Sequence, residues 1–186
     1  MPVQIGANVH CFSNPTGLLS DCHRRFEMFL GSLEAVGKTI DRPLTEETAR
    51  ALTSALRYFR EAAPKHTADE EESLFPRLRQ IRNPEVQAVL ARVKDLERDH
   101  RWATAVHAKV DRLGQRYLST ARLSPDEVEQ FRAAVSQLAA MYREHIRIED
   151  SAIFPVADRL LSQTERASIA REMAVRRNIG FPKNIV

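Results

Sequence analysis

A histidine and a glutamate separated by four positions recur twice in this chain of 186 residues, as His66 with Glu70 and as His145 with Glu149. In both copies an apolar residue, a phenylalanine and a proline follow the histidine at positions eight, nine and ten. Residues four apart lie on the same face of an α-helix, so each copy would direct an imidazole and a carboxylate the same way. This is the geometry of a metal-ligand pair. Its recurrence 79 residues later favours metal binding over two solvent-exposed ion pairs.

Helices must position these residues. The chain has only six glycines and long stretches with an apolar residue at every third or fourth position, which predict an all-α protein. We expect four long helices and a short, basic fifth helix that ends near Arg177. Prolines in first turns and serine or threonine caps mark where they begin. The expected starts are Pro15, Thr45, Pro84, Pro125 and Ser162.

Three features should shape these helices further. Gly37 and the segment 41–43 should end the first helix, and the third should end near Gly114 or Leu118. Pro64 lies two residues before His66. A proline inside a helix removes a backbone hydrogen bond, so the second helix should bend there.

The apolar faces of the first and third helices also contain histidines, and each half of the chain combines one of them with a His-x3-Glu pair. The intervals match closely, because His23 precedes His66 by 43 residues and His100 precedes His145 by 45. In an up-down-up-down four-helix bundle the six side chains would converge from four helices. The candidate metal ligands are His23, His66, Glu70, His100, His145 and Glu149.

Such a set of ligands predicts which metals bind. Buried imidazoles and carboxylates are costly unless they are paired or hold a cation. Nitrogen and oxygen ligands without sulfur suit iron, manganese or zinc. Two ions fit better than one, because a single ion with six side-chain ligands would have no open position, whereas two carboxylates can bridge a pair of ions.

The order of these residues, together with Phe75-Pro76 and Phe154-Pro155, resembles the hemerythrin-like, or HHE cation-binding, family over about residues 15–160. The resemblance implies a non-haem di-iron four-helix bundle, with two iron ions bridged by the two glutamates and by an oxo or hydroxo group. Zinc or manganese would be substitutes. Ferritin-like di-iron proteins differ, because they use Glu-x-x-His pairs with glutamates on the other helices.

One position departs from the oxygen-carrying members of that family. The resemblance implies that their third helix supplies two ligands, the second being a histidine four residues after the first. This chain has Thr104 at the second position. Threonine does not replace imidazole as a strong neutral donor, so one ion should have an additional open position. His107 is the alternative donor, but it lies seven residues beyond His100, about 10 Å along the helix axis. We expect it to be a core histidine.

Other polar residues have simpler interpretations. Glu27 is either a third carboxylate ligand or a surface or supporting residue, and we expect the latter. The acidic neighbours of Glu70, which are Asp69, Glu71 and Glu72, should form a solvated face. We expect His10 to be exposed, and Cys11 and Cys22 to be isolated thiols and not a redox pair.

Composition narrows the remaining functional classes. The net charge is +3, and the 28 basic residues are interleaved among 25 acidic ones. This pattern does not indicate a basic surface that binds nucleic acid or a membrane. Two cysteines, the absence of a signal-like start and the lack of a long apolar run favour a cytoplasmic protein. We expect an irregular segment 1–14, a hemerythrin-like bundle 15–161, and a short helix and tail 162–186 that packs on the bundle or contacts a partner.

These observations lead to a functional hypothesis. We expect a di-iron protein that binds or senses dioxygen, nitric oxide or a related small oxidant in a stress response, so its partner would be a small diatomic gas or peroxide. The alternatives are a di-iron enzyme that decomposes peroxide or another small oxidant, and an iron storage or donor protein. The sequence does not choose between them or name a protein partner.

Overall fold

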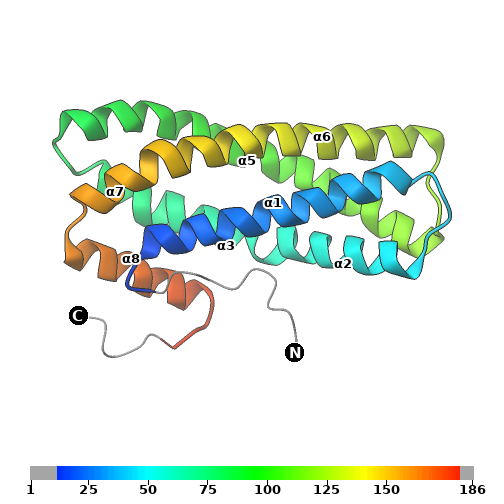
Figure 1. The fold of residues 1–186 in the computed structure, drawn as a ribbon, viewed down its shortest axis with the longest axis horizontal. Helices are drawn as coiled ribbons and strands as arrows, with labels where there is room; N and C mark the ends of the chain where they lie inside the picture. The colour runs from blue at the N-terminus through cyan, green and yellow to red at the C-terminus, as the bar shows by residue number, and fades with distance from the viewer. Residues whose placement is uncertain (1–11, 181–186) are drawn as a thin grey trace. The chain divides into compact units, whose positions relative to one another are not determined.

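The computed structural model describes residues 12–180, and these residues form helices and connecting turns without a strand (Figure 1). The helices make five stretches, two of which are subdivided where the helix changes type or is interrupted. The symbol η marks a π-helical turn. The elements are α1 (Pro15–Thr39), α2 (Glu46–Glu61), α3 (Ala63–Ala68), η1 (Asp69–Leu74), α4 (Phe75–Leu78), α5 (Pro84–Thr120), α6 (Pro125–Ile148), η2 (Glu149–Ile153), α7 (Phe154–Leu160) and α8 (Gln163–Arg176).

The helix starts agree with the local signals in the sequence. The Thr45 side chain caps α2 by accepting from the backbone N–H of Thr48, and Ser162 forms a complete capping box with Glu165 at the start of α8. The first helix, however, continues past Gly37 to Thr39. One interior glycine costs a helix only about 1 kcal/mol, which the packing of the neighbouring buried Val36 offsets.

A bend was expected at Pro64, and the structure shows that the helical stretch is interrupted there. Helix α2 ends at Glu61, Ala62 forms a turn, and α3 begins at Ala63. Pro64 has no N–H to offer the carbonyl of Arg60, and its ring would collide with that carbonyl in a regular helix. The chain therefore breaks two residues before the proline, and a separate short helix carries His66.

The described residues form two compact units. Unit 1 comprises residues up to Arg25, Pro64–Glu97 and residues from Ile146 onward. Its buried core is aliphatic and aromatic, and α8 contributes Ile169 and Met173 to it. The sequence expectation that the fifth helix is packing support agrees with this contact.

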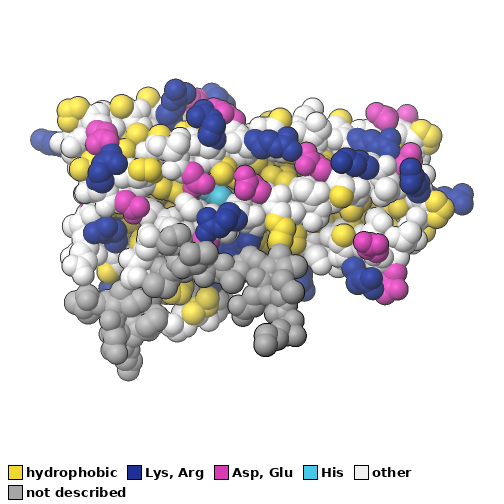
Figure 2. All heavy atoms as spheres, in the orientation of Figure 1, with side chains coloured by type: hydrophobic (Ala, Val, Ile, Leu, Met, Phe, Trp, Pro, Cys, Tyr) yellow, Lys and Arg dark blue, Asp and Glu magenta, His cyan; other side chains and the backbone are white. Residues whose placement is uncertain are grey.

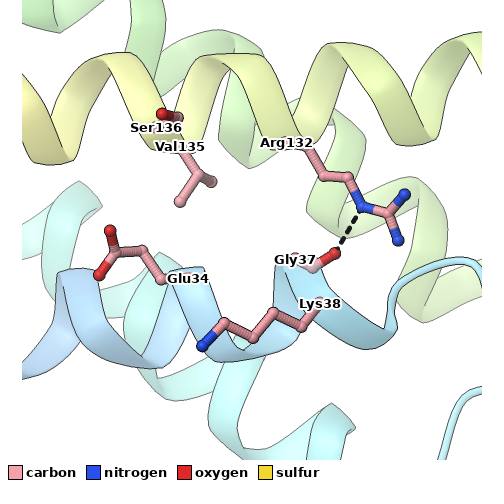
Figure 3. Close-up of a pocket in the computed structure, with 6 residues that line it drawn as sticks. All are labelled: Glu34, Gly37, Lys38, Arg132, Val135 and Ser136. Carbon is pink, nitrogen blue, oxygen red and sulfur yellow. Dashed lines mark hydrogen bonds between the residues drawn. The ribbon is translucent and has the colours of Figure 1, made fainter.

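Unit 2 comprises Phe26–Ala63 and Arg98–His145. Aromatic rings form part of its core: the ring of Phe26 lies 5.7 Å from that of Phe59 and 5.1 Å from that of Tyr142, measured between centroids. A surface pocket of about 330 Å³ opens in the same unit, where Arg132 Nε donates to the Gly37 carbonyl at 2.8 Å (Figure 3). None of the predicted metal ligands is among the residues that line this pocket.

Charged side chains are distributed as the composition suggested. Basic and acidic side chains are interspersed on the visible face, with apolar patches between them (Figure 2). Within residues 12–180, no helix is both long and apolar enough to cross a membrane.

Candidate metal centre

Four of the six predicted ligands meet in the interior of unit 1. His23 on α1, His66 on α3, Glu70 on η1 and Glu149 on η2 each direct one ligand atom to a common point, and these four atoms lie within 4.8 Å of one another. The four residues are 2%, 4%, 0% and 0% exposed. A buried group of two nitrogen and two oxygen donors is the arrangement expected around one metal ion.

The distances show where these donors converge. His66 Nε2 lies 3.1 Å from His23 Nε2 and 3.0 Å from Glu70 Oε1. His23 Nε2 lies 3.2 Å from Glu149 Oε2 and 3.9 Å from Glu70 Oε1. The two imidazole nitrogens face each other, and carboxylate oxygens surround them. All of these atoms can direct lone pairs at the same cation. The residues present therefore fit a metal ion.

Electrostatics favour a positive charge at this point. Burial raises the pKa of Glu70 well above its ordinary value, and the nearby negative charge of Glu149 raises it further. Burial alone would lower the pKa of His23, but hydrogen bonds and charges from Asp150 and Glu149 outweigh it and raise the pKa to about 9. The negative charge of Glu149 contributes to both shifts, and a bound cation would neutralise it.

Asp150 supports His23 from outside the ligand group. Its Oδ1 lies 3.0 Å from His23 Nδ1 and also accepts from Ser20 Oγ at 2.7 Å. When Nδ1 carries the hydrogen of the imidazole, the lone pair of Nε2 faces the centre, which is how carboxylates commonly orient metal-binding histidines. Sequence reasoning missed this residue. Its only signal was an acidic group five positions after a candidate ligand, His145.

Both glutamates lie in π-helical turns, which sequence reasoning also missed. The N–H of Phe75 donates to the carbonyl of Glu70 and that of Phe154 to the carbonyl of Glu149, each five residues earlier. A proline follows each phenylalanine and lacks an N–H, and its ring would crowd the carbonyl four residues before it. A wider turn relieves this crowding. The repeated Phe-Pro pair thus accounts for the π-helical turn at each glutamate.

The other two predicted ligands lie in unit 2. The ring centroids of His100 and His145 are 4.6 Å apart, and the two residues are 6% and 2% exposed. Asp99 Oδ2 lies 3.5 Å from His145 Nδ1. Thr104 is exposed, and its hydroxyl donates to the backbone carbonyl of His100 at 2.9 Å. Threonine is thus occupied with its own helix backbone.

The remaining candidates are not among the four grouped ligands. Glu27 is exposed, in agreement with a surface role. His107 Nε2 lies 2.9 Å from the Tyr142 hydroxyl, as expected for a hydrogen-bonded core histidine. Cys22 is buried and accepts from Arg25 Nη2 at 3.1 Å. His10 and Cys11 lie outside the described residues.

One expectation about the acidic run was wrong. Asp69 is 0% exposed, whereas Glu72 is exposed and Glu71 partly so. Its carboxylate binds Arg176 Nη1 at 3.0 Å and Arg177 Nη2 at 2.5 Å. These arginines follow it by more than a hundred residues, so no local pattern could reveal the pairing.

A family model described as the Hemerythrin HHE cation binding domain matches residues 14–157. The chain belongs to this family. No curated protein matches it. As in the prediction, the hemerythrin HHE chain is an all-α helical bundle, and the family together with the buried His/Glu cluster indicates a metal-binding protein. The matched region ends before α8, so this helix and its arginines lie beyond the family's domain.

Proposed function

We propose that the protein holds two iron ions and uses them to bind or sense a small oxidant such as dioxygen, nitric oxide or peroxide. One observation carries this proposal: four buried donors, two imidazole nitrogens and two carboxylate oxygens, lie within 4.8 Å of one another in a member of the HHE family. Neutral nitrogen and anionic oxygen donors suit iron, and zinc or manganese would fit the same atoms.

The first ion is assigned to His23, His66, Glu70 and Glu149. His100 and His145 would hold the second ion. Adjacent imidazoles at positions 100 and 145 support this, as does Glu149 following His145 by one helical turn. Two ions held by these six side chains would keep coordination positions for a small ligand.

The chain's own residues prepare the site for this ligand. Bound iron would supply a redox centre and a Lewis acid. Asp150 orients His23, and the buried surroundings of the cluster exclude bulk water, which strengthens every charge interaction there. Because Thr104 donates its hydroxyl to the backbone, it supplies no ligand in place of a histidine. One ion would therefore have an additional open position.

Metal analysis tests the proposal directly. Protein purified without added metal should contain two iron ions per chain, and its optical spectrum should change on reduction. His145→Ala should lose metal, whereas Glu27→Ala, which alters an exposed carboxylate on the same helix as His23, should retain both ions. A single tightly bound ion at saturation would reject the dinuclear site, and full metal content in the His145 variant would reject its assignment.

The open position also favours a second function, the decomposition of peroxide or another small oxidant. A ligand that reaches an open coordination position can react there instead of only binding reversibly. Turnover of peroxide without loss of iron would support this enzyme. A reversible complex with a gas and no turnover would support the binding protein, and steady release of iron would support a storage or donor role.

A further inference from the structure

Helix α8 lies outside the matched family domain but packs against the π-helical turn that carries Glu70. Its apolar face places Ile169 and Met173 in the core of unit 1, together with Leu74 from η1. Its polar end reaches the same turn through Arg176 and the residue that follows the helix, Arg177. One short element therefore contacts η1 through both apolar packing and charge.

The polar contact centres on Asp69, the residue before the ligand Glu70. Both guanidiniums bind its carboxylate, Arg176 to Oδ1 at 3.0 Å and Arg177 to Oδ2 at 2.5 Å. Arg176 also donates to Ser73 Oγ at 2.9 Å and to Glu72 Oε2 at 3.0 Å. The arginines thus bind side chains at three positions of η1.

Burial makes this contact sensitive to the loss of either partner. Asp69 is 0% exposed, and the side chains of the two arginines are 19% and 22% exposed. A buried carboxylate that loses one partner leaves an uncompensated charge, so the chain must keep the arginines in place or rearrange η1.

The backbone of η1 makes it sensitive to such an anchor. A π-helical turn is rare, and the packing of α8 on η1 adds contacts from outside to the local effect of the Phe-Pro pair. Asp69 and Glu70 are consecutive residues of this turn. Any movement that follows loss of the Asp69 contact would also move the carboxylate of Glu70.

We propose that Arg176 and Arg177 are positioning residues for the metal ligand Glu70, and that the docking of their guanidiniums on Asp69 sets how tightly the ion in unit 1 is retained. The inference rests on the proposed metal site, and it assigns a role in that site to a C-terminal element beyond the family's domain. The arginines do not touch the ion. They act by fixing the turn from which its ligand projects.

The test compares two variants of this contact with one matched control. Arg177→Gln removes one charge, and Asp69→Asn removes the carboxylate. The control is Arg166→Gln, which removes one positive charge from α8 and the bond from Arg166 Nη1 to the Asp158 carbonyl on α7, at 3.1 Å. Each full-length protein is loaded with Co²⁺, whose ligand-field spectrum reports coordination geometry. Loss of Co²⁺ to an excess of chelator is then followed, with a thermal unfolding curve for each variant.

Arg177→Gln and Asp69→Asn should each speed Co²⁺ loss by about tenfold or more and alter the Co²⁺ spectrum. The double variant should lose Co²⁺ no faster than the worse single variant, because both changes break the same contact. Arg166→Gln should match the wild type in spectrum and rate. If Arg177→Gln does not fold, Arg177→Lys, which keeps the charge but loses the planar fork, should give an intermediate rate.

Two other results would overturn the inference. Unchanged Co²⁺ spectra and rates in the Asp69 and Arg177 variants would show that the arginines do not position Glu70. Equal acceleration in Arg166→Gln would show that α8 acts only through general docking. If the wild-type chain itself retains no metal, the proposed function fails together with this inference, and that outcome is visible before any variant is compared.

Discussion

His107 is the histidine of α5 that we do not assign to metal, and its environment makes a quantitative prediction about pH. Its ring stacks on Phe59 with centroids 4.6 Å apart, and its Nε2 lies 2.9 Å from the Tyr142 hydroxyl. Burial lowers its pKa from 6.5 to about 4. The folded protein therefore keeps this imidazole neutral at a pH where the unfolded chain protonates it.

The sign and size of the effect follow from that difference. Above pH 6.5 the imidazole is neutral in both states and has no effect on stability. As the pH falls below 6.5, the unfolded state binds the proton more readily, so the free energy of unfolding decreases by about 1.4 kcal/mol per pH unit until the folded pKa of about 4 is reached. At about pH 5 the loss from this residue alone is about 2 kcal/mol.

Urea unfolding of the wild type and of His107→Gln isolates this term. Glutamine can hydrogen-bond to the Tyr142 hydroxyl but does not titrate. All other titrating groups are common to the two proteins, so their effects cancel in the difference between the two free energies of unfolding. Between about pH 7.5 and 5, this difference should shift by about 2 kcal/mol in favour of the variant.

Two results would refute this reasoning. Parallel pH profiles for the two proteins would show that His107 is not held neutral by its surroundings. Loss of metal from His107→Gln at neutral pH would show that the imidazole is a ligand and not a hydrogen-bonded core residue.

Three further predictions test the ligands and the packing. Glu149→Ala should lose metal and unfold at a lower temperature than the wild type, and unchanged metal content would exclude it as a ligand. Gly31→Ala should raise the free energy of unfolding by about 1 kcal/mol, because nothing lies within 4 Å of the added Cβ. Gly114→Ala should lower the free energy of unfolding by about 1 kcal/mol or more, because the added Cβ would lie 2.7 Å from Leu56 Cδ1. Urea unfolding measures both glycine variants, and changes of the same sign would contradict this prediction. Because Thr104 leaves a position open, rapid mixing of the reduced protein with oxygenated buffer should give no stable oxygenated spectrum. A spectrum that persists and is discharged by removing oxygen would disprove the open position.

Local patterns in the sequence were sufficient to predict the helices and the inward faces. Thr45 and Ser162 cap their helices through residues three positions away, so both interactions are encoded within a single turn. The periodicity that placed His23 and His66 on apolar faces depends only on the geometry of one helix. Both residues are buried, and with Glu70 and Glu149 they form one group.

Other parts of the candidate site depend on residues far apart in the chain. Asp150 reaches His23 across 127 positions, and Asp69 is held by Arg177 across 108. From sequence alone Asp69 belongs to an acidic run, and such runs are usually solvated. Only the packing of α8 against η1 removes it from water and supplies its guanidinium partners.

The π-helical turns depend both on the local sequence and on tertiary packing. The Phe-Pro pair is local and visible in both copies, but whether a proline bends, breaks or widens a helix depends on what else packs there. Pro64 breaks the helix, whereas Pro76 follows a π-helical turn. Backbone propensity restricts the choices, and the free energy of burying the surrounding side chains selects among them. The sequence by itself therefore determined the helices and the inward position of the six candidate ligands, because both depend on the geometry of single helices. Tertiary packing decided how the donor atoms are oriented and supported, because those contacts join residues far apart in the chain.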